Sequence, residues 1–207
     1  NNYTKEFDIL SPYDVNIYYN ETFKKVEPGK EAKFVIGIEN NGTEEDNFTV
    51  EHTTMPEFWN VTLQGVSGGK VHLKSKEQKN ITVSIEPPQH ALKGETERLT
   101  LWVNTSQGSK SKNVTLTVEV KQVYKVELNF ASQSTQKIVP NEQVTYLILV
   151  KNTGNGDDRF KITARNVPSD WRAKVNSKTS DTINLARGKS RIIYFNVTSP
   201  DINNIEN

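Results

Sequence analysis

The chain has 207 residues, a formal net charge of +1 and no cysteine, which excludes disulfides, zinc–thiolate sites and thiol nucleophiles. Positive and negative side chains are interspersed along it, a pattern that argues against a broad nucleic-acid-binding face. The apolar runs all fall short of the roughly 18 residues that a membrane-spanning helix needs.

Short alternations of apolar and polar residues, typical of half-buried strands, recur through the first 120 residues. They cover residues 2–9, 14–19, 33–39, 48–50, 59–63, 71–73, 81–85, 99–103 and 114–120. Between two of them, Asn40, Asn41 and Gly42 predict a hairpin turn, because these residue types tolerate positive φ. No stretch has a convincing helical period, so the sequence predicts an all-β sandwich.

The sequence from Pro28 to Trp59 recurs without a gap from Pro140 to Trp171, at an offset of 112. The match continues beyond the tryptophan, where Leu185 aligns with Leu73. Self-similarity at a fixed period is the signature of repeated domains. We therefore predict tandem immunoglobulin-like β-sandwich domains, with residues 11–121 as the first and residues 122–207 as the second, which lacks its final strands.

At an offset of 111, residues 2–9 align with residues 113–120, the expected last strand of the first sandwich. Residues 1–10 are thus expected to be the last strand of a preceding repeat, in a chain that is a window from a longer tandem array. The alternative is that residues 1–10 are a donor strand that completes the open sandwich of another subunit.

The repeated motif consists of Pro28-Gly29 before a strand, Asn40 and Gly42 after it, Pro56 to Trp59, and a strand ending at Pro87-Pro88. It resembles the NEW3/CARDB-type immunoglobulin-like repeats of prokaryotic, especially archaeal, cell-surface proteins. In the second copy Asn141 replaces the glycine that the family usually has at position 29. The resemblance implies an extracellular β-sandwich array.

Nine positions match the acceptor pattern for N-glycosylation, Asn-x-Ser/Thr. They are Asn2, Asn20, Asn41, Asn47, Asn60, Asn80, Asn104, Asn113 and Asn196. The alternation of the strands places eight of them at positions whose side chains face solvent, and it places Asn41 in a turn. An attached glycan needs such positions, because it must project into solvent. The alternative is that these matches arise by chance, because the strands are rich in threonine. Only Asn196 lies in the second unit, so we expect a sugar-coated first unit and a second unit whose surface is free for a neighbour.

Three further groups of residues are candidates for a specific role. The acidic turns with Glu45, Asp46, Asp157 and Asp158 offer oxygen ligands for calcium, although such carboxylates are more often simply solvated. Trp59 and Trp171 occupy equivalent inward positions and are expected to be core anchors. Trp102 lies on the outward phase, where it is a possible contact to another subunit or to a glycan.

The sequence contains no catalytic motif, and its three histidines have no ligand spacing, so we expect neither an enzyme nor a cofactor. The expected function is a non-catalytic structural or assembly segment of a glycosylated extracellular surface, S-layer or filament protein. The expected partners are other copies or neighbouring repeats of the same assembly and covalent N-glycans, with no nucleic acid and no membrane span. The alternatives are a carbohydrate- or protein-binding adhesion module, and accessory domains of a larger cell-surface hydrolase.

Overall fold

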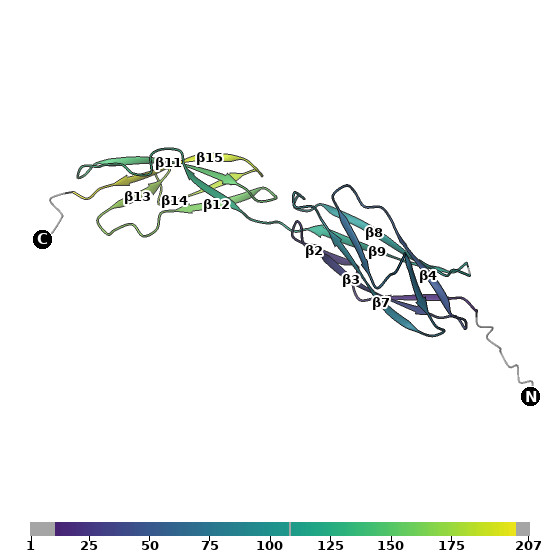
Figure 1. Cartoon of the computed structure of the whole chain (residues 1–207). Helices are drawn as coiled ribbons and strands as arrows, with labels where there is room; N and C mark the ends of the chain where they lie inside the picture. Colours follow the sequence, from purple (N-terminus) through teal and green to yellow (C-terminus); the bar gives the residue numbers. More distant parts are fainter. Residues whose placement is uncertain (1–10, 108, 202–207) are drawn as a thin grey trace, which may run out of the picture. The chain divides into compact units, whose positions relative to one another are not determined.

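A computed structural model describes residues 11–107 and 109–201 (Figure 1). Within these ranges the chain is built of strands and contains no helix, and therefore none that is long and apolar enough to cross a membrane. It divides into two compact units, Asn1–Lys121 (unit 1) and Gln122–Asn207 (unit 2). The strand predicted at residues 2–9 and the acceptor Asn2 lie outside the described residues.

Unit 1 contains a four-stranded and a five-stranded sheet. The four-stranded sheet has the order β1 (Val15–Tyr19), β3 (Ala32–Asn40), β7 (Gln78–Glu86) and β5 (Asn60–Gln64). The five-stranded sheet has the order β2 (Phe23–Val26), β9 (Ser111–Val120), β8 (Thr96–Asn104), β4 (Asp46–His52) and β6 (Lys70–Leu73). Strand β2 pairs with β9 in parallel, and the other pairs are antiparallel.

The core of unit 1 lies between these sheets, because successive side chains of a strand point to opposite faces. Phe34 on β3, Phe48 on β4 and Leu101 on β8 are fully buried in one cluster, whereas the alternate positions of the same strands are mostly polar and more exposed. The predicted β-sandwich architecture is in this respect confirmed.

The predicted hairpin around Asn40 is wrong, because β3 and β4 belong to different sheets. Neither Asn41 nor Gly42 has positive φ. The buried Asn40 side chain instead donates to the carbonyls of Glu44 and Leu73, at 2.8 and 3.1 Å, and so ties the end of β3 to β6 in the other sheet. Glycine is needed at 42 for space, since a Cβ there would lie 2.2 Å from the Pro12 carbonyl oxygen.

Unit 2 repeats part of this plan. Its larger sheet has the order β10 (Val126–Phe130), β11 (Gln143–Asn152), β15 (Ser190–Thr198) and β13 (Arg172–Val175), and its smaller sheet pairs β12 (Asp158–Thr163) with β14 (Ser180–Leu185). At the sequence offsets above, these strands correspond to β1-β3-β7-β5 and to β4-β6. The described part of unit 2 has no counterpart of β2, β8 or β9.

Local turn chemistry is also repeated. Gly29 has a φ of 68° and Asn141, at the equivalent position, a φ of 59°. Asparagine is one of the few residues that tolerate this left-handed conformation, so the Gly-to-Asn difference leaves the turn intact. The segment 135–138, equivalent to β2, forms no strand, since β2 takes its hydrogen bonds from β9 and the described part of unit 2 has no such partner.

Within the described residues, the core of unit 2 is smaller than that of unit 1. Among the described residues, the core cluster of unit 1 contains 18 buried hydrophobic residues and that of unit 2 contains five. Phe160, equivalent to Phe48, is only half-buried. In the part of the chain that the structure describes, one face of the larger sheet of unit 2 is therefore partly uncovered.

Candidate functional site

The eight described acceptor asparagines are all accessible to some degree. Asn20, Asn47, Asn60, Asn80 and Asn113 are exposed, and Asn41, Asn104 and Asn196 are half-buried. Those on strands alternate with side chains that point inward, as the sequence predicted. Three lie on strands of the five-stranded sheet, Asn47, Asn104 and Asn113, and two on strands of the four-stranded sheet, Asn60 and Asn80.

Asn41 differs from the other acceptors because its side chain is already engaged. Its Nδ2 donates to the Asp14 carboxylate at 2.8 Å, and Lys76 Nζ donates to its backbone oxygen at 2.6 Å. A glycan is attached through Nδ2, so glycosylation at Asn41 would disrupt the contact with Asp14. Geometry thus makes Asn41 the least favourable acceptor on unit 1.

Trp102 lies half-buried on the outward face of β8. The strand register places it opposite Asn113 on β9 and opposite Glu51 on β4. Directly opposed residues have Cβ atoms about 4.5–5.5 Å apart, so a glycan on Asn113 would begin beside the indole ring. The contact role of Trp102 stays a prediction.

The other two tryptophans, predicted as core anchors, are both half-buried. Trp59 packs against the core cluster of unit 1. Trp171 is not among the described residues that pack against the core cluster of unit 2. The equivalent sequence positions therefore differ in how closely they approach a core.

The acidic turns have protein partners. Asp46 is buried and accepts hydrogen bonds from the Asn47 amide and from the amide and hydroxyl of Ser106. Asp158 likewise accepts from the amide that follows it, and Asp157 from the Arg187 amide. Glu45 approaches His72, at 3.9 Å. No group of three or more acidic, histidine or cysteine side chains that could hold a metal occurs in residues 11–107 and 109–201, and we derive no calcium site from these turns.

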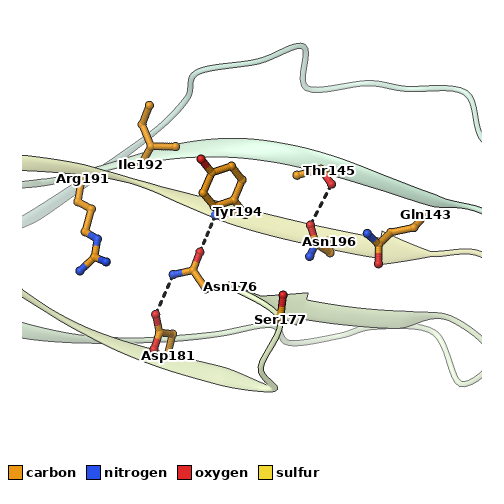
Figure 2. Close-up of a pocket in the computed structure, with 9 residues that line it drawn as sticks. All are labelled: Gln143, Thr145, Asn176, Ser177, Asp181, Arg191, Ile192, Tyr194 and Asn196. Atoms are coloured by element: carbon orange, nitrogen blue, oxygen red, sulfur yellow. Dashed lines mark hydrogen bonds between the residues drawn. The ribbon is translucent and has the colours of Figure 1, made fainter.

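Unit 2 carries an open, mostly polar hollow of about 510 Å³ on the outward side of β15, which we call the β15 pocket (Figure 2). Gln143 and Thr145 come from β11, Asn176 and Ser177 from the turn after β13, and Asp181 from β14. Arg191, Ile192, Tyr194 and Asn196 come from β15. The Tyr194 side chain is 55% exposed and offers an aromatic surface among amide groups.

A tight turn positions one wall of the β15 pocket. Asn176 and Ser177 both have positive φ, 47° and 67°, between the bridged residues Val175 and Lys178. The Asn176 side chain accepts from the Tyr194 amide at 2.8 Å and donates to Asp181 at 2.7 Å (Figure 2). The hydrogen bond from the Asn176 side chain lowers the pKa of Asp181 below its ordinary value, and a second hydrogen bond from Lys178 contributes in the same direction. Both bonds favour the charged carboxylate.

The side chains around the β15 pocket are suited to binding a small polar ligand. Amides, a carboxylate and a guanidinium around an aromatic face provide hydrogen bonds and apolar contact for a hydroxylated ligand. The β15 pocket was not predicted from the sequence. Two signals could have indicated it: the Asn176-Ser177 turn, and the alternation that makes Ile193 buried and Tyr194 exposed.

The equivalent surface of unit 1 is different. At the offset of 112, Tyr194 aligns with Thr82 and Ile192 with the acceptor Asn80. Unit 1 thus carries a candidate glycosylation position where unit 2 carries an exposed apolar side chain, 44% exposed at Ile192. The two units share a strand plan, and their outer surfaces have diverged.

Comparison with known proteins gives no family: no family model matches the chain, and no curated protein matches it. Solved structures with a similar course include a protein of unknown function from Porphyromonas gingivalis W83, at 15% identity and a TM-score of 0.38, covering 90% of this chain and 83% of that one. Another is the secreted serine protease VesC from Vibrio cholerae, at 13% identity and 0.36, covering 89% and 46%. A third is the Escherichia coli chaperone DraB, at 11% identity and 0.34, covering 87% and 84%. Likenesses at these scores carry no functional inference.

Proposed function

We propose that this chain is a non-catalytic structural or assembly segment of a glycosylated extracellular surface, S-layer or filament protein built from tandem immunoglobulin-like repeats. The observation that carries the proposal is the repeated strand plan. The order β10-β11-β15-β13 repeats β1-β3-β7-β5, and the pair β12-β14 repeats β4-β6. Repetition of a sandwich domain along a chain suits a spacer or lattice component, because each unit adds length and needs no catalytic residues to do so.

The acceptor positions support an extracellular location. None of the eight described acceptors is buried, so each has access to solvent, which a glycan requires. Asn60 lies on β5, an outer strand of its sheet. A glycan near such a strand would block unwanted pairing of its free edge with other chains.

The test is the intact mass of the protein from its native source before and after glycan removal, followed by glycopeptide mapping. We expect sugar on exposed acceptors such as Asn47, Asn80 and Asn113, and a bare Asn41. A protein that carries no sugar on any of the acceptors would contradict the glycoprotein part of the proposal. Protease treatment of intact source cells tests the location, because an extracellular segment is cleaved while cytoplasmic markers are protected.

The β15 pocket favours a second candidate function, a carbohydrate- or protein-binding adhesion module. Exposed Tyr194 supplies the flat aromatic surface on which a sugar ring can stack. Screening the chain against immobilised glycans should then show binding that Tyr194→Ala removes. Tyr124→Ala is the matched control, since Tyr124 is also an exposed tyrosine of unit 2, at 69%, and does not line the pocket.

A further inference from the structure

An aromatic side chain stands two positions before half of the acceptor asparagines that have a residue there. Eight of the nine acceptors have such a residue, and in four cases it is aromatic, although aromatic residues make up 9% of the chain. Fewer than one case would be expected by chance, so the spacing calls for a physical reason. The pairs are Tyr18 and Asn20, Phe58 and Asn60, Trp102 and Asn104, and Tyr194 and Asn196.

The two members of a pair are present or absent together in the two units. In each of the three pairs that can be compared, the unit without the acceptor also lacks the aromatic side chain. The equivalent pairs are Asp170 and Arg172 for Phe58 and Asn60, Thr82 and Ser84 for Tyr194 and Asn196, and Asn129 and Ala131 for Tyr18 and Asn20. The fourth pair lies on β8, which has no counterpart in the described part of unit 2. The aromatic side chain thus accompanies the acceptor and not the strand.

Strand geometry places the members of two pairs side by side on an outward face. Side chains two positions apart on a strand point to the same side and are about 6.6 Å apart. Trp102 and Asn104 lie in this way on β8, where both are half-buried and alternate with buried residues. Tyr194 and Asn196 lie on β15 and both line the β15 pocket, as Figure 2 shows.

A third pair lines a hollow on the outer side of the four-stranded sheet. Tyr18, Asn20 and the further acceptor Asn80 surround this hollow of about 210 Å³. Gly37 of β3 lies directly opposite Tyr18 in the strand register, and a Cβ there would lie 2.9 Å from the Gln78 amide nitrogen. Glycine inside a strand often marks a place that something else approaches closely. The hollow therefore offers space for a group next to the Tyr18 ring.

Hydrogen bonds leave the attachment atom of two acceptors available. The Ser111 hydroxyl donates to Asn104 Oδ1 at 2.6 Å, and the Thr145 hydroxyl donates to Asn196 Oδ1 at 2.9 Å. A glycan is attached through Nδ2, so both bonds can persist after attachment and fix the direction of the first sugar. Asn41 is the contrasting case, because its Nδ2 is the atom that donates to Asp14.

The aromatic members of the pairs expose more apolar surface than the fold requires. Tyr18, Phe58 and Tyr194 are 48%, 61% and 55% exposed. Phe58 also has a φ of 70°, which is an outlier for a bulky residue. A pyranose ring carries C–H groups on one face, and this face can cover an aromatic ring in the way that another apolar group does.

We propose that Tyr18, Trp102 and Tyr194 are contact residues for the chain's own N-glycans. Each ring holds the first sugar of the glycan on the asparagine two residues later, with the C–H face of the pyranose against the aromatic face. The contact removes apolar surface from water and so stabilises the unit that carries the glycan. This inference rests on the glycoprotein part of the proposed function.

The covalent link favours the attached glycan over a free ligand as the occupant. Stacking of one sugar on one ring is weak, and a tethered sugar gains from its high effective concentration beside the ring. In the β15 pocket, the first sugar on Asn196 would also occupy the place that a free sugar needs on Tyr194. The proposal therefore assigns the Tyr194 ring to the glycan on Asn196.

Unit 2 gives the sharper test, because Asn196 is the single acceptor in residues 122–207. The full chain is secreted from a eukaryotic host that attaches N-glycans, and these are trimmed enzymatically to the first N-acetylglucosamine. Four chains are compared: the unaltered chain, Tyr194→Ala, Asn196→Gln and the double variant. Hydrogen exchange with mass spectrometry follows the unfolding of unit 2 in urea, and glycopeptide mapping reports whether Asn196 carries sugar.

We expect the sugar on Asn196 to lower the unfolding equilibrium constant of unit 2 about two- to tenfold when Tyr194 is present, and to have little effect in the Tyr194→Ala chain. The same four chains made in bacteria without glycans should show no such coupling. Tyr194→Phe should keep the effect, because it retains the ring. Tyr124→Ala should keep it as well, since Tyr124 is exposed at 69% and does not line the pocket.

Unit 1 provides a matched comparison between two acceptors of one sheet. Trp102→Ala should remove the stabilisation that the sugar on Asn104 provides. It should leave unchanged any contribution of the sugar on Asn47, an exposed acceptor on β4 that follows Glu45 and has no aromatic residue two positions before it.

Three results on the secreted chain would each overturn the proposal: no sugar on Asn196, no stabilisation by that sugar, or equal stabilisation with and without the Tyr194 ring. The mass of the native protein tests the proposed function separately. A native chain without sugar, combined with coupling in the secreted chain, would contradict the glycoprotein function and leave the contact between sugar and ring established.

Discussion

Truncating the same phenylalanine in each unit should have unequal effects on stability. Phe48 and Phe160 occupy equivalent positions on β4 and β12 and face their respective cores. Phe48 has no exposed surface, and Phe160 is half-buried. Replacing a fully buried phenylalanine by alanine costs about 3–5 kcal/mol, and the transfer part of that cost scales with the area removed from water.

Phe48→Ala should therefore lower the free energy of unfolding of unit 1 by about 4 kcal/mol, and Phe160→Ala should lower that of unit 2 by roughly half as much. With a urea m value of about 2 kcal/mol/M, the midpoints should move by about 2 M and about 1 M. Pulse-labelling hydrogen exchange with mass spectrometry follows each unit separately during the denaturation.

Equal losses in the two variants would refute this reasoning, because they would mean that Phe160 is as completely enclosed as Phe48.

Three further predictions follow from individual contacts. Asn40→Ala should destabilise unit 1 by about 1–3 kcal/mol in a urea denaturation, because the buried hydrogen bond from the Asn40 side chain to the Leu73 carbonyl is lost; an unchanged midpoint would remove the role given to this amide. Gly154→Ala should cost unit 2 about 1–3 kcal/mol, since a Cβ there would lie 2.4 Å from the Val123 carbonyl oxygen, and a variant of wild-type stability would contradict that clash. The lowered pKa of Asp181 stabilises the β13–β14 turn above the carboxyl's ordinary pKa, and this contribution is lost as the pH falls through the lowered value. NMR of the Asn176 side-chain amide should follow that loss, and Asp181→Asn should abolish the pH dependence.

The existence and type of most strands could be predicted from the sequence, because apolar and polar residues alternate along a half-buried strand. The stretches around Ile36, Ile81 and Leu116 are recognisable in this way, and the offset of 112 relates the two units through their residues alone. Strand β2, whose Phe23–Val26 sequence is short and carries two lysines, was not predicted. Its strand conformation depends on its parallel partner β9.

The β15 pocket could not be predicted as a site, since its residues come from three strands and a turn that are distant in sequence. The alternation of β15 identifies Tyr194 as outward-facing, but it does not show that Asn176 lies beside it. That proximity arises from the pairing of β13 with β15, which brings the turn after Val175 next to Tyr194.

The sequence by itself determined the strands, their repetition and the outward phase of the acceptor asparagines, because these depend on local alternation along the backbone. Only the tertiary structure decided which strands share a sheet, since turn residues such as Asn41 and Gly42 signal a change of direction without specifying the next hydrogen-bonding partner. The same holds for exposure. Val15 and Val126 occupy equivalent places in similar sequences, and one is buried while the other is open because burial depends on the strands that lie opposite.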